Sequence, residues 1–200
     1  MPISRKIMGV SKGGVSKKAI FGYGTSNFTN LVSVIGVVSG DVTGVGSARY
    51  YLAASSYGAD KVIFGYGYNG SYVSMTNLVS NSGVVASDVT GVGTARGYLG
   101  ASSYGTDKAI FGYGNFGGSQ SMTNLVSNSG VVASDVTGVG TAREGLAASS
   151  YGTDKAIFGY GYVGGSQSMT NLVSNSGVVA SDVTGVGTAR YGLAASSYGT

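Results

Sequence analysis

The sequence contains no cysteine, no histidine and no tryptophan, one proline, and a single glutamate, Glu144. Without cysteine there can be no disulfide and no thiolate metal site, so packing must stabilise the fold. The absence of histidine removes the most common general base, and the absence of cysteine removes the thiolate nucleophile. The seven aspartates are spread along the chain, whereas a calcium site needs clustered oxygen ligands. We therefore expect a protein that is not an enzyme and has neither a cofactor nor a metal site.

Charged residues are also scarce, at 10% of the 200 residues, with a net charge of +4. The positive charge is concentrated in the first 18 residues, which contain no acidic residue and five basic ones: Arg5, Lys6, Lys12, Lys17 and Lys18. The remaining 182 residues carry seven basic and eight acidic groups. A basic arm of this kind can contact a phosphate backbone, an anionic membrane or an acidic protein surface. We expect it to anchor the protein to a partner, without recognition of a specific nucleic-acid sequence.

Long apolar segments are missing as well. No stretch is long and apolar enough for a transmembrane helix, and residues 1–14 lack the apolar centre of a secretory signal. The sequence therefore predicts a soluble, cytoplasmic protein without a membrane span or a signal peptide, unless it is part of a larger particle.

What the sequence does contain is one unit repeated in tandem. The arginine of a TAR or SAR triplet recurs every 47 residues, at Arg49, Arg96, Arg143 and Arg190, and the clear copies begin at residues 18, 60, 107 and 154. A fixed period of this length indicates a repeat protein in which each unit buries its apolar face against its neighbours. We interpret residues 18–200 as one domain of four repeats. Residues 1–17 are either a basic arm or, over residues 3–11, a diverged first strand.

Each repeat contains four short segments that suit β-strands. In the last full copy these are segment a (residues 145–151), segment b (155–161), segment c (168–174) and segment d (178–186). Glycine, asparagine and aspartate separate them, as expected for tight turns. Glycine every few residues and abundant valine, isoleucine and threonine argue against helix. Four antiparallel strands in about 47 residues predict one blade of a β-propeller.

The order of the segments also predicts how the propeller closes. The clear repeats begin with segment b and end with a complete segment a, residues 191–200. Pairing of this last segment with the first segment b would complete four four-stranded blades and close an all-β, four-bladed ring. If residues 3–11 form a strand instead, one edge stays unpaired and invites a partner chain.

The repeat resembles the kelch repeat. The likeness lies in the order TARxGLAA, KAIFGYG, MTNLV and VVASDV, with an arginine before the first strand and glycines after the second, and it covers residues 18–200. The sequence departs from the kelch pattern where Gly159 and Gly161 bracket Tyr160 instead of being adjacent, and in having no tryptophan. The FGYG and TGVGTAR motifs are also similar to tandem repeats in predicted proteins of marine bacteriophages, particularly cyanophages. This resemblance implies a component of a phage particle.

The repeated arginines allow two interpretations. In a propeller, Arg49, Arg96, Arg143 and Arg190 form a ring near one face, where their guanidinium groups could bind a carboxylate, sulfate or phosphate. Alternatively they are structural, because an aspartate precedes each arginine by eight residues, at Asp41, Asp88, Asp135 and Asp182. A turn could bring the two charges together within one repeat or between neighbours.

The loops between segments b and c are the variable part of the repeat. They read TSNF, YNGSYV, NFGGSQ and YVGGSQ, and the antiparallel order places them on the same face as the loops between segments d and a. Aromatic and amide side chains on loops above a rigid scaffold are typical of a binding surface. The candidate binding residues are Asn27, Phe28, Tyr68, Asn69, Tyr72, Asn115, Phe116, Gln120, Tyr162 and Gln167.

From these observations we expect a structural or interaction module that contacts other protein subunits, as a tail or capsid-surface protein of a phage virion. The alternative is a lectin that uses the same loops to bind glycans on a host surface, since several weak equivalent sites gain strength together.

Overall fold

The computed structural model describes residues 17–199, and within this range the fold is all-β, without any helix. Eleven strands form four small antiparallel sheets, numbered here in chain order. Sheet 1 contains β1 (Ala19–Gly22) and β2 (Thr29–Val32); sheet 2 contains β3 (Ala53–Tyr57), β4 (Lys61–Gly65) and β5 (Thr76–Val79); sheet 3 contains β6 (Gly100–Tyr104), β7 (Lys108–Asn115) and β8 (Ser119–Val126); sheet 4 contains β9 (Ala147–Tyr151), β10 (Lys155–Tyr162) and β11 (Ser166–Val173).

The strands correspond to segments a, b and c of the repeat. Tyr57 lies opposite Lys61 across the turn between β3 and β4, and Tyr104 lies opposite Lys108 in sheet 3. The short turns between these partners contain residues with a positive φ, among them Gly58 and Thr106. The same register in each three-stranded sheet follows from the near-identity of the copies.

Segment d forms less structure than the four-stranded prediction. In sheet 3 it forms two isolated bridges, through Val132 and Val136, and the NH of Ala133 also donates to the carbonyl of Leu125 (2.8 Å). Between them the side chain of Asn124 donates hydrogen bonds to the carbonyl of Ala133 (3.0 Å) and to the carboxylate of Asp135 (2.9 Å). Because a side chain takes the place of part of the main-chain ladder, a continuous fourth strand does not form.

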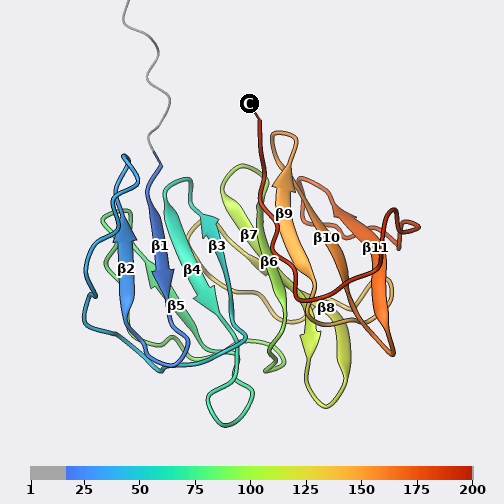
Figure 1. Cartoon of the computed structure of the whole chain (residues 1–200), viewed down its shortest axis with the longest axis horizontal. Helices are drawn as coiled ribbons and strands as arrows, with labels where there is room; N and C mark the ends of the chain where they lie inside the picture. Colours follow the sequence, from blue (N-terminus) through green and yellow to red (C-terminus); the bar gives the residue numbers. More distant parts are fainter. Residues whose placement is uncertain (1–16, 200) are drawn as a thin grey trace, which may run out of the picture.

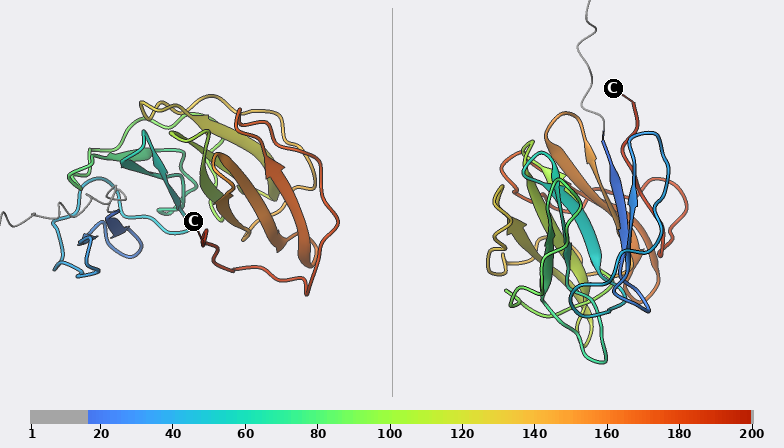
Figure 2. Two further views of the ribbon diagram at one scale, coloured as in Figure 1. Left: turned by 90° about the horizontal axis from the view of Figure 1, so that it is seen from above. Right: turned by 90° about the vertical axis from the view of Figure 1, so that its left-hand side faces the viewer.

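The four sheets stand side by side with their strands roughly parallel to one common direction (Figure 1). Seen from above, they follow an open arc, with sheet 1 at one end and sheet 4 at the other (Figure 2). The first strands β3, β6 and β9 neighbour one another, so segment a is the innermost strand of each sheet. The arrangement is propeller-like, and small residues in segment a allow these inner strands to approach.

The predicted closure of the ring is not formed. Among residues 17–199, β1 pairs only with β2, and residues 191–199 form no strand. Instead this last segment a runs along the concave side of the arc (Figure 2). Sheet 1 therefore has two strands where the others have three. The residues Arg5, Lys6 and Lys12 and the candidate strand 3–11 lie outside the described range, whereas Lys17 and Lys18 are exposed.

The core lies between neighbouring sheets. Phe111 of sheet 3 packs its ring on Gly65 of sheet 2, where a Cβ atom would lie only 2.7 Å from the ring. The edge of Phe111 also meets the ring of Tyr66, with 5.1 Å between the centroids. Phe158 repeats both contacts with Gly112 and Tyr113 of sheet 3. Each buried phenylalanine contributes about 1.5–3 kcal/mol through removal of apolar surface from water, so these junctions hold the arc together.

No helix among residues 17–199 has the length and apolar character needed to cross a membrane.

Candidate functional site

The loops between segments b and c lie beside the links between segments d and a, as the strand order predicts. Tyr50 forms a bridge with Tyr68, and the equivalent pair in the last full repeat is Glu144 with Tyr162. These loops form the lower edge of the molecule in Figure 1. Two stretches that are separate in each repeat thus form one continuous surface.

This surface is rich in aromatic side chains, and we call it the aromatic face. Its members are Tyr50, Tyr51, Tyr68, Tyr72, Tyr98, Phe116, Tyr162 and Tyr191. Tyr51 stacks on Tyr98 of the next repeat, with 3.9 Å between ring centroids and 18° between planes. Tyr72 meets Tyr68 and Phe116 edge to face, at 5.3 and 6.1 Å. All of these rings except Tyr72 are exposed, so the face presents several clusters of aromatic rings to solvent, and Tyr162 with Tyr191 forms a separate pair.

The amide side chains on this side hold the loops together. Gln120 donates hydrogen bonds to the carbonyls of Phe116 (3.2 Å) and Gly118 (2.9 Å) in its own hairpin, and Gln167 bonds its own loop in the same way. Asn115 accepts a hydrogen bond from the Tyr72 hydroxyl (3.1 Å) and donates one to the Glu144 carboxylate. The predicted amides therefore serve mainly as braces beneath the aromatic rings.

Three other predicted residues take different positions. Asn27 turns inward and donates to the carbonyl of Gly46 (2.6 Å), whereas Phe28 is exposed. Asn69 lies at an exposed loop tip, where its main-chain NH donates to the carbonyl of Ser71 (3.1 Å). Phe28 forms no pair with another aromatic ring within residues 17–199, so the first repeat adds little to the aromatic face.

The sequence-based prediction missed Tyr50, Tyr51, Tyr98 and Tyr191. They follow the repeat arginine directly, where the four copies read YY, GY, EG and YG. This variation between near-identical flanks is the same signal that marked the b-to-c loops. Tyr51 and Tyr98 have positive φ angles of 55° and 56°, and the equivalent residues in the later copies are glycines. Non-glycine residues in this region are uncommon, and such outliers concentrate at functional sites.

Three of the four repeat arginines are fully buried. Arg96 donates from Nε to the carbonyl of Tyr113 (2.8 Å) and from its terminal nitrogens to the carbonyl of Thr94 (2.9 Å) and to Asn124 (2.6 Å). It also lies 3.8 Å from the carboxylate of Asp135. Arg49 and Arg143 make the equivalent contacts, so their guanidinium groups face protein atoms and present no surface to a dissolved anion.

The ion pairs connect neighbouring repeats. Arg49 pairs with Asp88 and Arg143 with Asp182, at 3.9 and 3.7 Å, so each arginine binds the aspartate of the repeat that follows it. Arg190 is exposed, and it forms no ion pair with an aspartate among residues 17–199. Asp41, which precedes the first repeat arginine, is exposed as well.

Burial shapes the ionisation of these groups. Burial lowers the pKa of Arg96, because it disfavours the charged form. Burial alone would raise the pKa of Asp135, but hydrogen bonds from Thr94 and Asn124 and the charge of Arg96 outweigh it and lower the pKa. Burial also raises the pKa of Tyr66 to about 12, although the nearby arginine opposes this shift. The lowered pKa of Asp135 favours its charged form beside Arg96.

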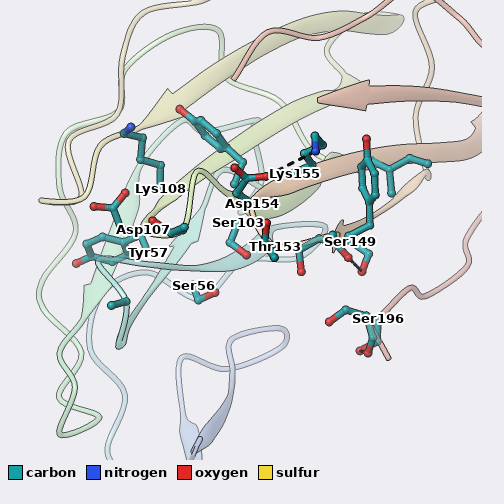
Figure 3. Close-up of a pocket in the computed structure, with 18 of the residues that line it drawn as sticks. Ser56, Tyr57, Ser103, Asp107, Lys108, Ser149, Thr153, Asp154, Lys155 and Ser196 are labelled. Atoms are coloured by element: carbon teal, nitrogen blue, oxygen red, sulfur yellow. Dashed lines mark hydrogen bonds and ion pairs between the residues drawn. The ribbon is translucent and has the colours of Figure 1, made fainter. Parts of the chain in front are cut away.

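The opposite face carries a polar hollow of about 540 Å³ at the concave side of the arc (Figure 3). Its lining includes serines from the end of segment a in all four copies, such as Ser103 and Ser149, and the aspartate and lysine of the a-to-b turn in sheets 3 and 4. Lys155 lies 3.8 Å from Asp154, which accepts a hydrogen bond from Asn175 (3.0 Å). Sequence analysis predicted no site here, although the repeated serine pair was visible. No group of three metal-binding side chains occurs within residues 17–199.

Comparison of the sequence with models of known protein families gave no match, and a search of curated proteins gave none either. The resemblance to kelch and phage repeats therefore rests only on the motifs described above.

Proposed function

We propose that this protein is a non-catalytic interaction module that binds a protein partner through the aromatic face. The observation that carries the proposal is the cluster of exposed rings around the stacked pair Tyr51 and Tyr98. Tyrosine and phenylalanine are enriched at the centres of protein interfaces, because they bury much apolar area and lose little conformational entropy. The hairpins beneath them are braced by Gln120 and Gln167, so the rings are held in place before binding.

The wider setting of this proposal is a propeller-like scaffold in a phage particle. Support for the particle comes from the similarity of the FGYG and TGVGTAR motifs to phage repeats. Support for the propeller comes from the four sheets in an arc with segment a innermost.

The test uses a substitution that the protein already tolerates elsewhere. Tyr98→Gly removes one ring of the stacked pair and installs the residue found at the equivalent positions 145 and 192. A photo-crosslinking residue at position 116, introduced in the producing cell, should give a protein adduct identified by mass spectrometry, and Tyr98→Gly should abolish it. The control is the same crosslinker at exposed Val131, on the side away from the aromatic face. Adducts that are equal at the two positions would contradict the proposal.

A second candidate function, glycan binding, is favoured by the polar hollow. Hydroxyl groups of Ser103 and Ser149, the Asp154 carboxylate and the half-exposed ring of Tyr151 lie around one concavity, a combination that suits a saccharide. Calorimetric titration with oligosaccharides checks this. Binding that is lost in Ser149→Val but kept in Tyr98→Gly would support the glycan site, and absence of binding would exclude it.

A further inference from the structure

Neighbouring sheets are joined by one set of contacts that recurs along the arc. Each junction seats a phenylalanine ring on a glycine of the preceding sheet, as Phe111 does on Gly65. Each also pairs an arginine with the aspartate of the following repeat, as Arg96 does with Asp135. A third contact places the tyrosine that ends segment a against a glycine of the following sheet, as Tyr57 does with Gly130.

The sheet 4 end of the arc presents one half of this junction. Gly159 stands at the position of Gly65, but a Cβ atom there would meet only Thr170. Tyr151 stands at the position of Tyr57 and is 37% exposed, against 3% for Tyr57. The guanidinium of Arg190 lies over the ring of Tyr160 at 4.3 Å, as in the other repeats, yet within residues 17–199 it donates only to the carbonyl of Thr188 (3.2 Å). We call this surface the leading end.

The sheet 1 end presents the other half. Phe21 stands at the position of Phe111 and is 62% exposed, whereas Phe111 is fully buried. Asp41 stands at the position of Asp135; it accepts a hydrogen bond from Asn30 (2.9 Å) but has no arginine partner among the described residues. Gly36 stands at the position of Gly130, and nothing lies within 4 Å of a Cβ atom built on it. We call this surface the trailing end.

The last segment a is already placed as the inner strand of a further sheet. The NH of Tyr98 donates to the carbonyl of Tyr51 (2.9 Å), Gly145 donates to Tyr98 (2.9 Å), and Gly192 donates to Gly145 (2.8 Å). The same main-chain hydrogen bond, which joins residues 47 positions apart, thus recurs beyond sheet 4. Ser196 and Ser197 line the same hollow as the serines of β6 and β9. The segment therefore lies beside β9 in the position of a further inner strand, and no segment b pairs with it among the described residues.

A groove between sheets 1 and 2 shows what the trailing end lacks. It has a volume of about 390 Å³ and is lined by Leu31, Gly83 and Val79 among others. In the next junction the equivalent groups, Leu78 and Gly130, contact the ring of Tyr57. The groove is therefore the seat of a tyrosine that ends a segment a.

We propose that a second copy of this chain docks head to tail, with its trailing end on the leading end of the first copy. Residues 193–198 of the first copy then pair with β1 of the second, and the ring of Tyr198 enters the groove of the second copy. Phe21 seats on Gly159, and Arg190 pairs with Asp41, so shape and charge both match. Within one chain sheets 1 and 4 lie at opposite ends of the open arc (Figure 2), whereas residues 196–199 line the same hollow as Lys17. A heterologous contact of this type produces either a closed ring of chains or a filament.

The first experiment blocks the junction without disturbing the isolated chain. Gly159→Leu fills the seat of Phe21, and in a free copy its Cβ atom would meet only the side chain of Thr170, at 3.3 Å, which a small shift of that side chain relieves. Gly165→Leu is the matched control, since nothing lies within 4 Å of a Cβ atom built on Gly165 and this residue lies in a loop outside the junction. Sedimentation velocity over a range of concentrations should show dimers or larger species for the 200-residue chain and for Gly165→Leu. Gly159→Leu should weaken self-association about tenfold or more. A monomeric wild-type chain, or equal association of Gly159→Leu, would overturn the proposal.

The second experiment separates a partner copy from closure within one chain. Ser56 and Val62 are opposite in sheet 2, and the equivalent residues of the proposed pairing are Ser197 and Ala19. Opposite residues have Cα atoms about 4.5–5.5 Å apart, within reach of a disulfide. The chain has no native cysteine, so a mixture of Ser197→Cys and Ala19→Cys should give a disulfide-linked dimer, absent when either variant is oxidised alone. A disulfide that forms only inside a Ser197→Cys/Ala19→Cys double variant would show intramolecular closure and refute the proposal.

The third experiment tests the charge pair and the role of the N-terminal residues. Arg190→Asp and Asp41→Arg should each weaken association, and the double variant should restore it. Deletion of residues 1–16 should leave self-association unchanged. If the deletion instead strengthens self-association to a level that the full chain never reaches, residues 1–16 occupy the edge of β1. In that case a second copy is not the occupant of this edge, and the proposal is wrong.

Discussion

Arg96 lies over the ring of Tyr66, with its guanidinium carbon 4.4 Å from the ring centroid. Tyr66 belongs to sheet 2, whereas the hydrogen-bond acceptors of Arg96 on Tyr113 and Asn124 belong to sheet 3. One buried cation thus joins two neighbouring sheets through a ring on one side and oxygen atoms on the other.

Replacement of this arginine should destabilise the protein strongly. Arg96→Met keeps much of the side-chain volume but leaves the carbonyl of Tyr113 and the amide of Asn124 without their donors. We expect a loss of about 3–5 kcal/mol in the free energy of unfolding, as for other broken buried charge networks. The control is Arg190→Met, which removes an exposed arginine and should cost at most about 0.5 kcal/mol in a monomeric sample. Urea unfolding followed by circular dichroism measures both, and similar losses would contradict the structural role of Arg96.

Acid should weaken the same contacts. The pKa values of Asp88, Asp135 and Asp182 are lowered, because hydrogen bonds and the arginine charge outweigh the burial that would raise them. A carboxyl group with a lower pKa in the folded state stabilises the fold above its unfolded pKa of 3.8, and this contribution disappears as the pH falls through the folded value.

We therefore expect the urea midpoint to decrease below about pH 4. Asp135→Asn should unfold at lower urea than the wild type at pH 7, and the difference between the two should shrink at pH 3. A difference that stays constant over this range would mean that ionised Asp135 contributes nothing to stability.

Alkaline pH should act through the buried tyrosines. Burial raises the pKa of Tyr66 and Tyr113 from 10.0 to about 12, so their neutral forms stabilise the fold below pH 10, and this contribution is lost as the pH rises towards 12. An ultraviolet absorbance titration should show a late phase that contains these two residues together with Tyr98, whose pKa the neighbouring Tyr51 raises to about 12. Tyr66→Phe should remove one late-titrating group and cost about 1 kcal/mol through loss of the 3.2 Å hydrogen bond to the carbonyl of Val92. An unchanged late phase would assign it to other residues.

The glycines under the phenylalanine rings should differ in their tolerance of alanine. A Cβ atom on Gly112 would lie 2.7 Å from the ring of Phe158, whereas one on Gly159 would meet only Thr170, at 3.3 Å. Gly112→Ala should cost about 1–3 kcal/mol through overpacking. Gly159→Ala should leave the stability of a monomeric sample nearly unchanged. Thermal unfolding of the two variants checks this, and a larger loss for Gly159→Ala would show that sheet 4 already has a neighbour.

The sequence by itself determined the repeat, the strand class and the face on which the variable loops lie. These depend on local features: the spacing of Arg49 and Arg96, the glycine-rich turns, and the antiparallel order that places Tyr68 beside Tyr50. It also identified Asp88 and its relatives as partners for the arginines. The sequence left open whether each arginine pairs with the aspartate of its own repeat or of a neighbouring repeat, because a turn could bring either aspartate close to the arginine.

Only the tertiary structure decided which repeat supplies each partner, how far the arc extends and where it stays open. The fit of Phe111 on Gly65 and of Tyr57 on Gly130 sets how neighbouring sheets pack, and no single segment encodes that geometry. The side chain of Asn124 likewise replaced part of the predicted fourth strand. Residues 194–198 have the same sequence as β9 but no neighbouring segment b among the described residues, so they remain unpaired. A strand needs a partner in space as well as a suitable sequence.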